Sequence, residues 1–210
     1  MEAEAGKGFL MAIEGIDQSG KKTLSDALLA RLEAHGVDAV AVSFPDYNTS
    51  IGREIRAYLA GTEDSLPEVR SLLFAANRWE RSGEIGSWLS EGKVVVANRY
   101  RGSGVAYGMA HGLEREWLWG LERGLPVEDR TILIEIPADI SFARKRRGRD
   151  AYERQPELLG RVGAAYRELA AEGGWLVLDG DQAIDTLAER IWDETGNLLL
   201  ARVDAEAGNG

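Results

Sequence analysis

The chain has 210 residues and a formal net charge of −10, and 44% of its residues are hydrophobic. This length and composition suit one domain with a sizeable core. The negative charge argues against a broad surface for nucleic acid or an anionic membrane, so we expect neither as a partner. Because the chain has no cysteine, disulfides, a thiol nucleophile and a cysteine zinc site are excluded.

The start of the chain, 1–8, is polar and acidic and lacks the basic residues and apolar stretch of a signal peptide. No apolar run approaches the length of a transmembrane helix. Both features favour a cytoplasmic protein. The two histidines, His35 and His111, are expected on the surface, because two histidines alone rarely build a metal or catalytic site.

An apolar run over 9–13 has the length of a strand and is followed by Gly15, a polar loop, Gly20 and Lys21. A helical pattern of apolar residues begins at Leu24. A strand, a glycine loop, a lysine and a helix in this order predict a phosphate-binding loop, in which backbone N–H groups and the helix N-terminus surround phosphate oxygens. The alternative is an ordinary glycine turn between a strand and a helix.

Alternating strand and helix patterns run through the rest of the chain. Strands are expected at 37–44, 93–98, 131–136 and 175–178, and helices at 51–59, 67–89, 158–169 and 184–199. Near-continuous apolar strands between helices predict an α/β three-layer sandwich: a five-stranded parallel sheet with helices on both faces, in a single domain. The acidic, glycine-rich segment 204–210 is expected to be frayed.

The helix expected at 67–89 places Val69, Leu72, Leu73 and Ala76 on a core stripe. Phe74 and Arg78, four residues apart, lie on another face. A ring beside a guanidinium can stack on a flat base and bond its edge. A partly buried phenylalanine and a surface arginine explain the same pair, and from these two residues alone that simpler interpretation is favoured.

A basic run occupies 144–149, with five cations in six residues. Holding them together without an anion is costly, which indicates a phosphate site. A solvated face and a nucleic-acid patch are the alternative interpretations.

In combination, these stretches resemble the thymidylate kinase family, a family of P-loop nucleoside monophosphate kinases. The resemblance covers the chain from Phe9 to about Leu200. The motifs that carry the resemblance, in order along the chain, are Gly15-Ile-Asp-Gln-Ser-Gly-Lys21, Phe44-Pro45, Leu73-Phe-Ala-Ala-Asn-Arg-Trp-Glu80, Asn98-Arg-Tyr100 with Ser103 and Tyr107, and a mobile lid at 144–153. No single motif is unique to the family, but their order and spacing together are specific.

The resemblance implies a homodimeric enzyme that transfers the γ-phosphoryl group of ATP to dTMP, as a step of dTTP biosynthesis, with Mg²⁺ delivered by ATP. It implies that ATP is bound by Gly15, Ile16, Asp17, Gln18, Ser19, Gly20, Lys21, Lys22, Thr23 and Arg144. It implies that dTMP is bound by Asp17, Phe44, Tyr47, Phe74, Arg78, Arg99, Ser103, Tyr107 and Tyr152.

Within this set the resemblance assigns particular roles. Asp17 would accept a hydrogen bond from the deoxyribose 3′-hydroxyl, and Arg99 would hold the dTMP phosphate. Tyr107 would crowd the ribose 2′ position, and Tyr152 would close over the nucleoside. Arg144 would lie near the adenine, and the aromatic–arginine pair of the long helix would hold thymine.

The family carries a catalytic arginine either in the phosphate loop or in the lid. The loop position after the aspartate is Gln18, so the resemblance implies the lid type. Lid arginines would compensate the charge of the transferring phosphoryl group. The catalytic candidates are Lys21, Arg99, Arg146, Arg147 and Arg149.

Three positions depart from the family pattern. Lys22 replaces the hydroxyl that binds Mg²⁺, Asn98 replaces an aspartate at a strand end, and Tyr47 replaces an arginine near the dTMP phosphate. The protein ligands of the metal therefore stay unknown. Either Lys22 does part of the metal's work, or the chain is a catalytically weakened nucleotide-binding module. A kinase for another pyrimidine deoxynucleotide or a nucleoside is the nearer alternative.

Overall fold

A five-stranded parallel sheet forms the centre of the protein, whose computed structural model describes residues 8–61, 65–144, 150–152 and 154–207. The strand order is β2-β3-β1-β4-β5, and every neighbouring pair is parallel. The predicted fold class is confirmed. The strands are β1 (Phe9–Glu14), β2 (Ala39–Ser43), β3 (Val94–Asn98), β4 (Arg130–Glu135) and β5 (Leu176–Asp179).

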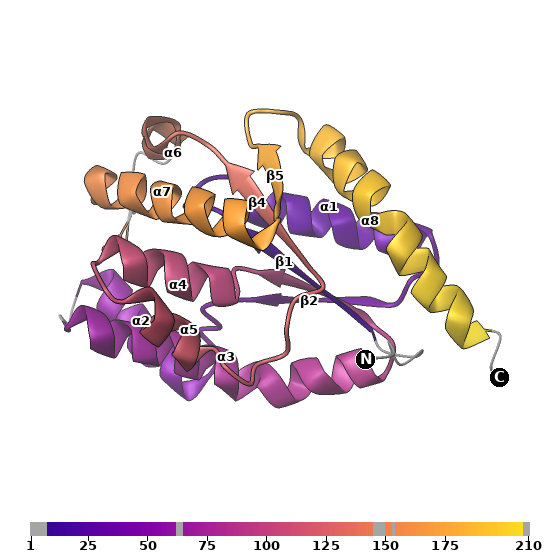
Figure 1. Ribbon diagram of the computed structural model, residues 1–210, viewed down its shortest axis with the longest axis horizontal. Coiled ribbons are helices and arrows are strands. Elements are labelled where there is room, and N and C mark those ends of the chain that lie inside the picture. The colour runs from indigo at the N-terminus through magenta and orange to yellow at the C-terminus, as the bar shows by residue number, and fades with distance from the viewer. Residues whose placement is uncertain (1–7, 62–64, 145–149, 153, 208–210) are drawn as a thin grey trace.

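Helices cover both faces of the sheet (Figure 1). Apolar side chains of α1 and α8 pack on one face, and the second face is covered by helices that include α3, α4 and α7. The helices are α1 (Lys21–Ala34), α2 (Ser50–Ala60), α3 (Pro67–Ser90), α4 (Arg101–Ala110), α5 (Arg115–Leu121), α6 (Ala138–Arg144), α7 (Pro156–Gly173) and α8 (Ile184–Ala207).

The register of the sheet brings three strand ends together. Ile13 and Ser43 both pair with Asn98, so the segments that follow β1, β2 and β3 leave the sheet at one edge. Side chains alternate between the two faces of a strand. Val94 and Val96 of β3 pack with α1, so Asn98 belongs to the α1 side, whereas Glu14 belongs to the opposite side. Ligands of open parallel sheets bind at this carboxyl edge.

The core stripe predicted for α3 is wrong at Val69 and Leu72, whereas Leu73 packs, partly buried, against the core. The side chains of Val69 and Leu72 are 42% and 49% exposed, whereas Asn77 and Arg78 are buried. The inner face of α3 meets polar groups: the Asn77 side chain accepts a hydrogen bond from the Asp46 backbone N–H at 2.7 Å and donates to the Asp46 carbonyl at 3.1 Å. The buried positions of α3 thus include polar side chains as well as the apolar Ile85, and a search for apolar periodicity does not detect the polar ones.

The C-terminal helix α8 continues through Ala207, so it includes 204–207, where the sequence predicts fraying. Alanine and glutamate, which are good helix formers, explain this continuation. Residues 208–210 lie outside the described part of the chain.

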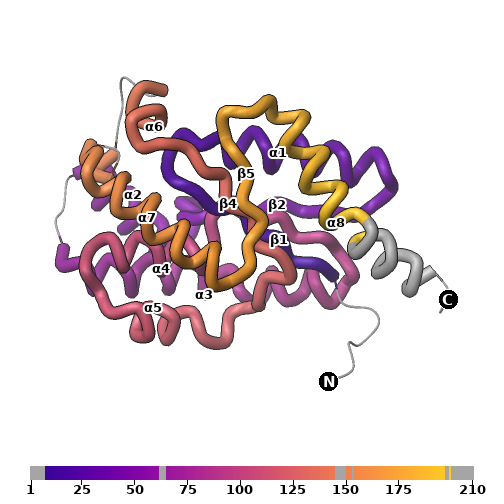
Figure 2. The backbone as a smooth tube through the Cα atoms, turned by 45° about the horizontal axis from the view of Figure 1, so that its top comes forward, coloured from indigo at the N-terminus to yellow at the C-terminus, as the bar shows by residue number. Residues whose placement is uncertain are grey.

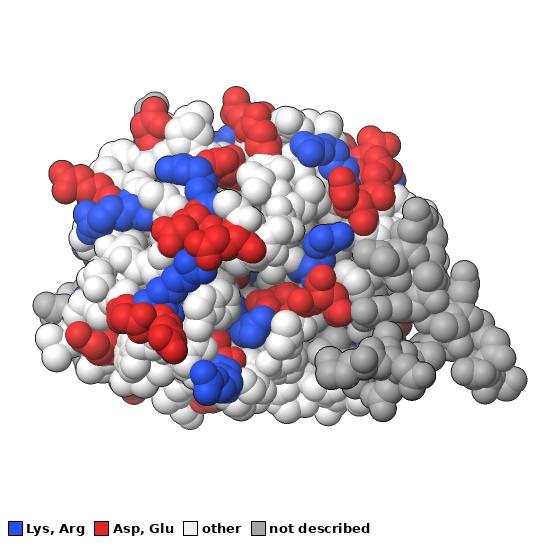
Figure 3. Space-filling model, in the orientation of Figure 1, with Lys and Arg blue, Asp and Glu red and all other residues white. Residues whose placement is uncertain are grey.

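The tube in Figure 2 shows α2, α6 and α7 at the end of the molecule remote from the C-terminus. Basic and acidic side chains are mixed on the face drawn in Figure 3, which shows no continuous basic surface there. Among the described helices, none combines the length and the hydropathy that a membrane span requires.

Candidate active site

The loop between β1 and α1 has the backbone that a phosphate-binding loop needs. Gly15 has a φ of 143°, and a Cβ there would lie 2.5 Å from the Ile134 carbonyl oxygen, so only glycine fits. Gly20, at the N-cap of α1, has a φ of 96°. Lys21 is buried, and its ammonium donates to the Ile16 carbonyl at 2.6 Å, which points it into the loop. The alternative of an ordinary turn does not explain a buried lysine here.

Helix α6 packs against this loop through polar contacts. The Ser141 hydroxyl donates to the Asp17 carbonyl at 2.7 Å. Arg144 donates to the Gln18 carbonyl at 3.2 Å and, from its other terminal nitrogen, to the Gly180 carbonyl at 3.3 Å. Arg144 therefore links the phosphate loop to the segment between β5 and α8. In this position it can contact a group that is attached to the bound phosphates.

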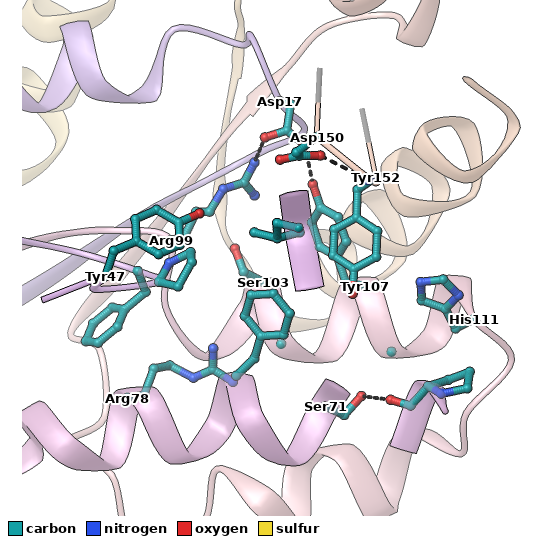
Figure 4. Close-up of a pocket in the computed structure, with 17 residues that line it drawn as sticks. Asp17, Tyr47, Ser71, Arg78, Arg99, Ser103, Tyr107, His111, Asp150 and Tyr152 are labelled. Atoms are coloured by element: carbon teal, nitrogen blue, oxygen red, sulfur yellow. Dashed lines mark hydrogen bonds and ion pairs between the residues drawn. The ribbon is translucent and has the colours of Figure 1, made fainter. Parts of the chain in front are cut away.

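A cleft lies beside the loop, between α3 and α4, with an empty volume of about 720 Å³ that includes its open mouth. Figure 4 shows Arg78 and Arg99 on the left, His111 on the right, and Tyr152 above Ser71 between them. The cleft is lined by all nine residues that the resemblance assigns to dTMP, namely Asp17, Phe44, Tyr47, Phe74, Arg78, Arg99, Ser103, Tyr107 and Tyr152.

At the sheet end of the cleft, Asp17 and Arg99 form an ion pair, with Nη2 of Arg99 2.6 Å from a carboxylate oxygen. The Tyr107 hydroxyl donates to the other oxygen of Asp17 at 2.8 Å. Burial raises the pKa of the Asp17 carboxyl, but Arg99 and Lys21 outweigh burial and hold that pKa below its usual value. Asp17 is therefore an ionised acceptor at neutral pH. Arg99 adopts a left-handed φ of 60°, a strained conformation for this residue type.

Arg78 is buried, which overturns the simpler interpretation of a surface arginine. Its Nε donates to Glu122 at 2.8 Å, and Nη2 makes a second bond to the other carboxylate oxygen. Both side chains are 2% exposed. Gly104 of α4 leaves room for this pair, because a Cβ there would collide with Nη2 of Arg78 and lie 2.7 Å from Glu122. Nη1 of Arg78 makes no bond with the described residues, and Arg78 lines the cleft.

Aromatic side chains fill the middle of the cleft. The rings of Phe74 and Tyr152 are stacked, with centroids 6.2 Å apart and an interplanar angle of 28°. Tyr107 and Tyr58 also contact the Tyr152 ring, at 5.2 and 5.7 Å. Two rings that hold a third flat ring between them must lie about 7–8 Å apart, because each stacking gap is about 3.5–4 Å. A flat ring placed between Phe74 and Tyr152 therefore requires these two rings to separate.

His111 lies in the far wall of the cleft, so its predicted surface position is wrong. Its Nε2 is buried and has no hydrogen-bond partner among the described residues. Burial, then Arg70 and Arg161, lower the pKa of His111 to about 4, so the imidazole is neutral at physiological pH. His35 is exposed, as predicted, with Nδ1 2.8 Å from the Arg31 carbonyl.

The two positions that depart from the usual metal site differ in burial. Lys22 is 79% exposed and forms an ion pair with Asp26 at 2.6 Å. Asn98 carries a buried Oδ1 that has no hydrogen-bond partner among the described residues. No group of three or more histidine or acidic side chains suited to a metal occurs in the described ranges. The site thus offers one unsatisfied oxygen and no carboxylate cluster.

Residues 145–149 lie outside the described part of the chain, and with them Arg146, Arg147 and Arg149. Several cleft residues escaped the sequence analysis. Glu122 stands 44 positions from its partner Arg78, and no local pattern connects them. The spacing of His111 offers a signal, because Ser103, Tyr107 and His111 recur every four residues on the cleft face of α4.

A P-loop on a five-stranded parallel sheet, beside a cleft with two arginines and an aromatic slot, defines a phosphotransferase for a small, flat, anionic acceptor. A family model described as thymidylate kinase matches residues 13–191. The curated thymidylate kinases of Schizosaccharomyces pombe and Plasmodium falciparum are 32% and 33% identical, each match covering 92% of this chain and 94% and 92% of the relative. A solved thymidylate kinase from Candida albicans aligns with a TM-score of 0.80 and 28% identity, covering 91% of this chain and 92% of the other.

The chain belongs to the thymidylate kinase family.

Proposed function

We propose that the protein phosphorylates dTMP to dTDP with ATP as donor. The observation that carries this proposal is the cleft itself, in which the phosphate loop, a buried arginine beside an aromatic ring, and Arg99 converge. Thymine would stack on Phe74 and accept a hydrogen bond at a keto oxygen from Nη1 of Arg78. The acceptor phosphate would lie against Arg99, near Asp17 and the loop.

The proposed reaction is a direct in-line transfer. A dTMP phosphate oxygen attacks the γ-phosphorus of ATP, the bond from that phosphorus to the β–γ bridging oxygen breaks, and ADP leaves. The attacking oxygen is already anionic, so no strong general base is required. Lys21 and the loop N–H groups hold the donor phosphates, and Arg99 holds the acceptor, so positioning and charge compensation supply the catalysis.

The residues present fit Mg²⁺ that arrives with ATP. When bound, Mg²⁺ neutralises phosphate charge and polarises the phosphoryl group. The unsatisfied Oδ1 of Asn98 is an oxygen acceptor of the kind that Mg²⁺ or its bound water uses. Lys22 adds a cation at the start of α1, and its exposed side chain can turn from Asp26 toward the phosphates. We propose that ATP and water supply most of the metal's ligands.

We propose that Arg146, Arg147 or Arg149 supplies the lid's catalytic charge, since the loop carries Gln18 where some family members have arginine. Replacing Arg149 with alanine tests one candidate. If turnover persists unchanged, Arg149 is not the catalytic arginine, and the choice moves to the other two.

A second copy of the chain is proposed to cover the outward side of α3. Leu66, Val69 and Leu72 expose 68%, 42% and 49% of their side chains along this helix, an apolar surface that a partner would shield. Light scattering of the parent chain and of Leu72→Glu tests this proposal. A dimeric parent and a monomeric variant support it, whereas a monomeric parent and a monomeric variant refute it. We also propose that the protein is located in the cytoplasm.

The acceptor range is tested by comparing dTMP, dUMP, dCMP and thymidine at fixed ATP. The proposal expects the highest kcat/KM for dTMP, and lower for dCMP, whose 4-amino group cannot accept from Arg78. The Candida albicans relative is described as having broad substrate specificity, so a graded preference is expected. A preference for thymidine would overturn the proposal that the acceptor is a nucleoside monophosphate. Nucleotide binding without turnover on any acceptor would favour a weakened binding module.

A further inference from the structure

Beneath Arg99 lies a buried polar group that the proposed reaction does not use directly. Glu14, the last residue of β1, is fully buried. One of its carboxylate oxygens accepts from the backbone N–H groups of Tyr100 and Ser103, at 2.9 and 3.1 Å. The other accepts from the Ser103 hydroxyl and, at 3.2 Å, from the Tyr166 hydroxyl. One carboxylate thus ties β1 to the first turn of α4 and to α7.

Tyr166 connects this group to Arg99. It belongs to α7 and is 1% exposed, in the core of the protein. Its hydroxyl lies 2.8 Å from the Ser103 hydroxyl and accepts from Nη1 of Arg99 at 3.4 Å. Because the Ser103 hydroxyl donates to Glu14, the Tyr166 hydroxyl directs its own proton toward Ser103 and Glu14, which leaves its lone pairs to accept from Arg99.

The bonds of Arg99 leave one side of its guanidinium open. Nη1 donates to the Gly15 carbonyl at 3.0 Å and to Tyr166, and Nη2 donates to Asp17 at 2.6 Å. A guanidinium has five N–H donors, so two remain without a partner in the described ranges, Nε–H and the second Nη2–H. Nε and Nη2 share an edge of the planar group, which is the geometry of a two-point contact with phosphate.

We propose that Tyr166, held by Glu14, is a positioning residue that fixes Arg99 with its Nε–Nη2 edge toward the acceptor phosphate. Without the Tyr166 hydroxyl, Nη1 keeps one partner, and the guanidinium can rotate about its long side chain. This inference rests on the proposed role of Arg99.

The test compares two ligands that differ only in phosphate. Tyr166→Phe removes one oxygen and keeps the buried ring. We expect the Kd of dTMP, measured by calorimetry, to rise about tenfold, since a hydrogen bond to a charged group is lost. The Kd of thymidine, which offers Arg99 no phosphate, should stay within about twofold of the parent value. A merely structural role would weaken both ligands alike.

Tyr100→Phe is the matched control. Tyr100 is also fully buried, but its hydroxyl donates to the Pro126 carbonyl at 3.2 Å, away from the cleft. We expect this variant to bind dTMP and thymidine like the parent chain. Glu14→Gln keeps the shape of the side chain and should lower the dTMP-to-thymidine affinity ratio in the same direction as Tyr166→Phe. Should Tyr166→Phe not fold, Ser103→Ala, which removes the hydroxyl beside it, carries the same comparison.

Arg99→Gln, which removes the charge, separates this inference from the proposed function. If the glutamine variant keeps the parent affinity ratio, Arg99 does not hold the phosphate, and the proposed site fails. If Arg99→Gln lowers the ratio while Tyr166→Phe and Glu14→Gln leave it unchanged, the positioning role alone is overturned. If all three lower it and Tyr100→Phe does not, the inference stands.

Discussion

Replacement of Glu122 by alanine tests the buried ion pair that holds Arg78 in the cleft wall. Glu122 and Arg78 are each 2% exposed and meet through two hydrogen bonds, so Glu122→Ala leaves a guanidinium buried without its counter-ion. Burial alone would lower the pKa of Arg78, but Glu122 raises it. The charge of Arg78 therefore persists in the folded protein only at a free-energy cost once Glu122 is gone.

The expected loss in the free energy of unfolding is about 3–5 kcal/mol, the usual cost of breaking a buried ion pair from one side. Replacing both partners with apolar residues of similar size, Arg78→Met with Glu122→Leu, should recover most of this loss, because no charge then stays buried. The structure thus predicts strong non-additivity in a double-mutant cycle.

Urea unfolding of the parent, Arg78→Met, Glu122→Leu and the double variant, at one pH and salt concentration, measures the cycle, and Glu122→Ala is unfolded under the same conditions. The kinetic readout is kcat/KM for dTMP, which should fall in Glu122→Ala because Arg78 is free to turn from the cleft. A loss in stability below about 1 kcal/mol, with additive single effects, would refute the reasoning, since it would mean that the pair is not buried or not coupled.

Three further predictions follow from other parts of the site. The pKa of His111 is depressed to about 4, so as pH falls below its unfolded value of about 6.5 the unfolded chain gains a proton first. The parent chain should therefore lose about 3 kcal/mol of stability relative to His111→Gln between pH 7 and pH 4, and parallel pH curves would contradict this. Gly15→Ala, which places a Cβ 2.5 Å from the Ile134 carbonyl oxygen, should lower stability by about 1–3 kcal/mol and abolish ATP binding; normal ATP affinity would show that the loop tolerates a side chain. Lys22→Thr should change stability by less than about 0.5 kcal/mol and lower the Mg²⁺ concentration at half-maximal turnover; an unchanged Mg²⁺ profile would mean that Lys22 has no metal-replacing role.

Sequence patterns located the scaffold because the scaffold depends on local rules. The apolar runs of β1 and β3 and the glycine spacing of the phosphate loop each follow from a few neighbouring residues. The long helix expected at 67–89 is α3, one residue longer than predicted. Its inward face could not be found in this way, because Asn77 and Arg78 are buried through partners in distant loops and helices.

The parts of the site that the sequence did not reveal are tertiary contacts. Glu122 is recognisable only once α5 places it beside Arg78, and Tyr166 only once α7 brings its hydroxyl to Arg99. The four-residue spacing from Tyr107 places His111 on the cleft side, but its contact with Tyr152 depends on the folded cleft. Glu122 and Tyr166 contact the predicted arginines from outside the local sequence pattern, so spacing along the chain carries no signal for them.

The most direct test of the account is ADP formation from ATP and Mg²⁺, measured with and without dTMP, for the parent chain and for Lys21→Ala. The account predicts turnover that depends on dTMP in the parent chain, with dTDP formed in equal amount to ADP, and a loss of at least 100-fold in Lys21→Ala, on the order of a catalytic electrostatic contact. ADP formation that is indifferent to dTMP, or no turnover despite tight binding of both nucleotides, would contradict the account.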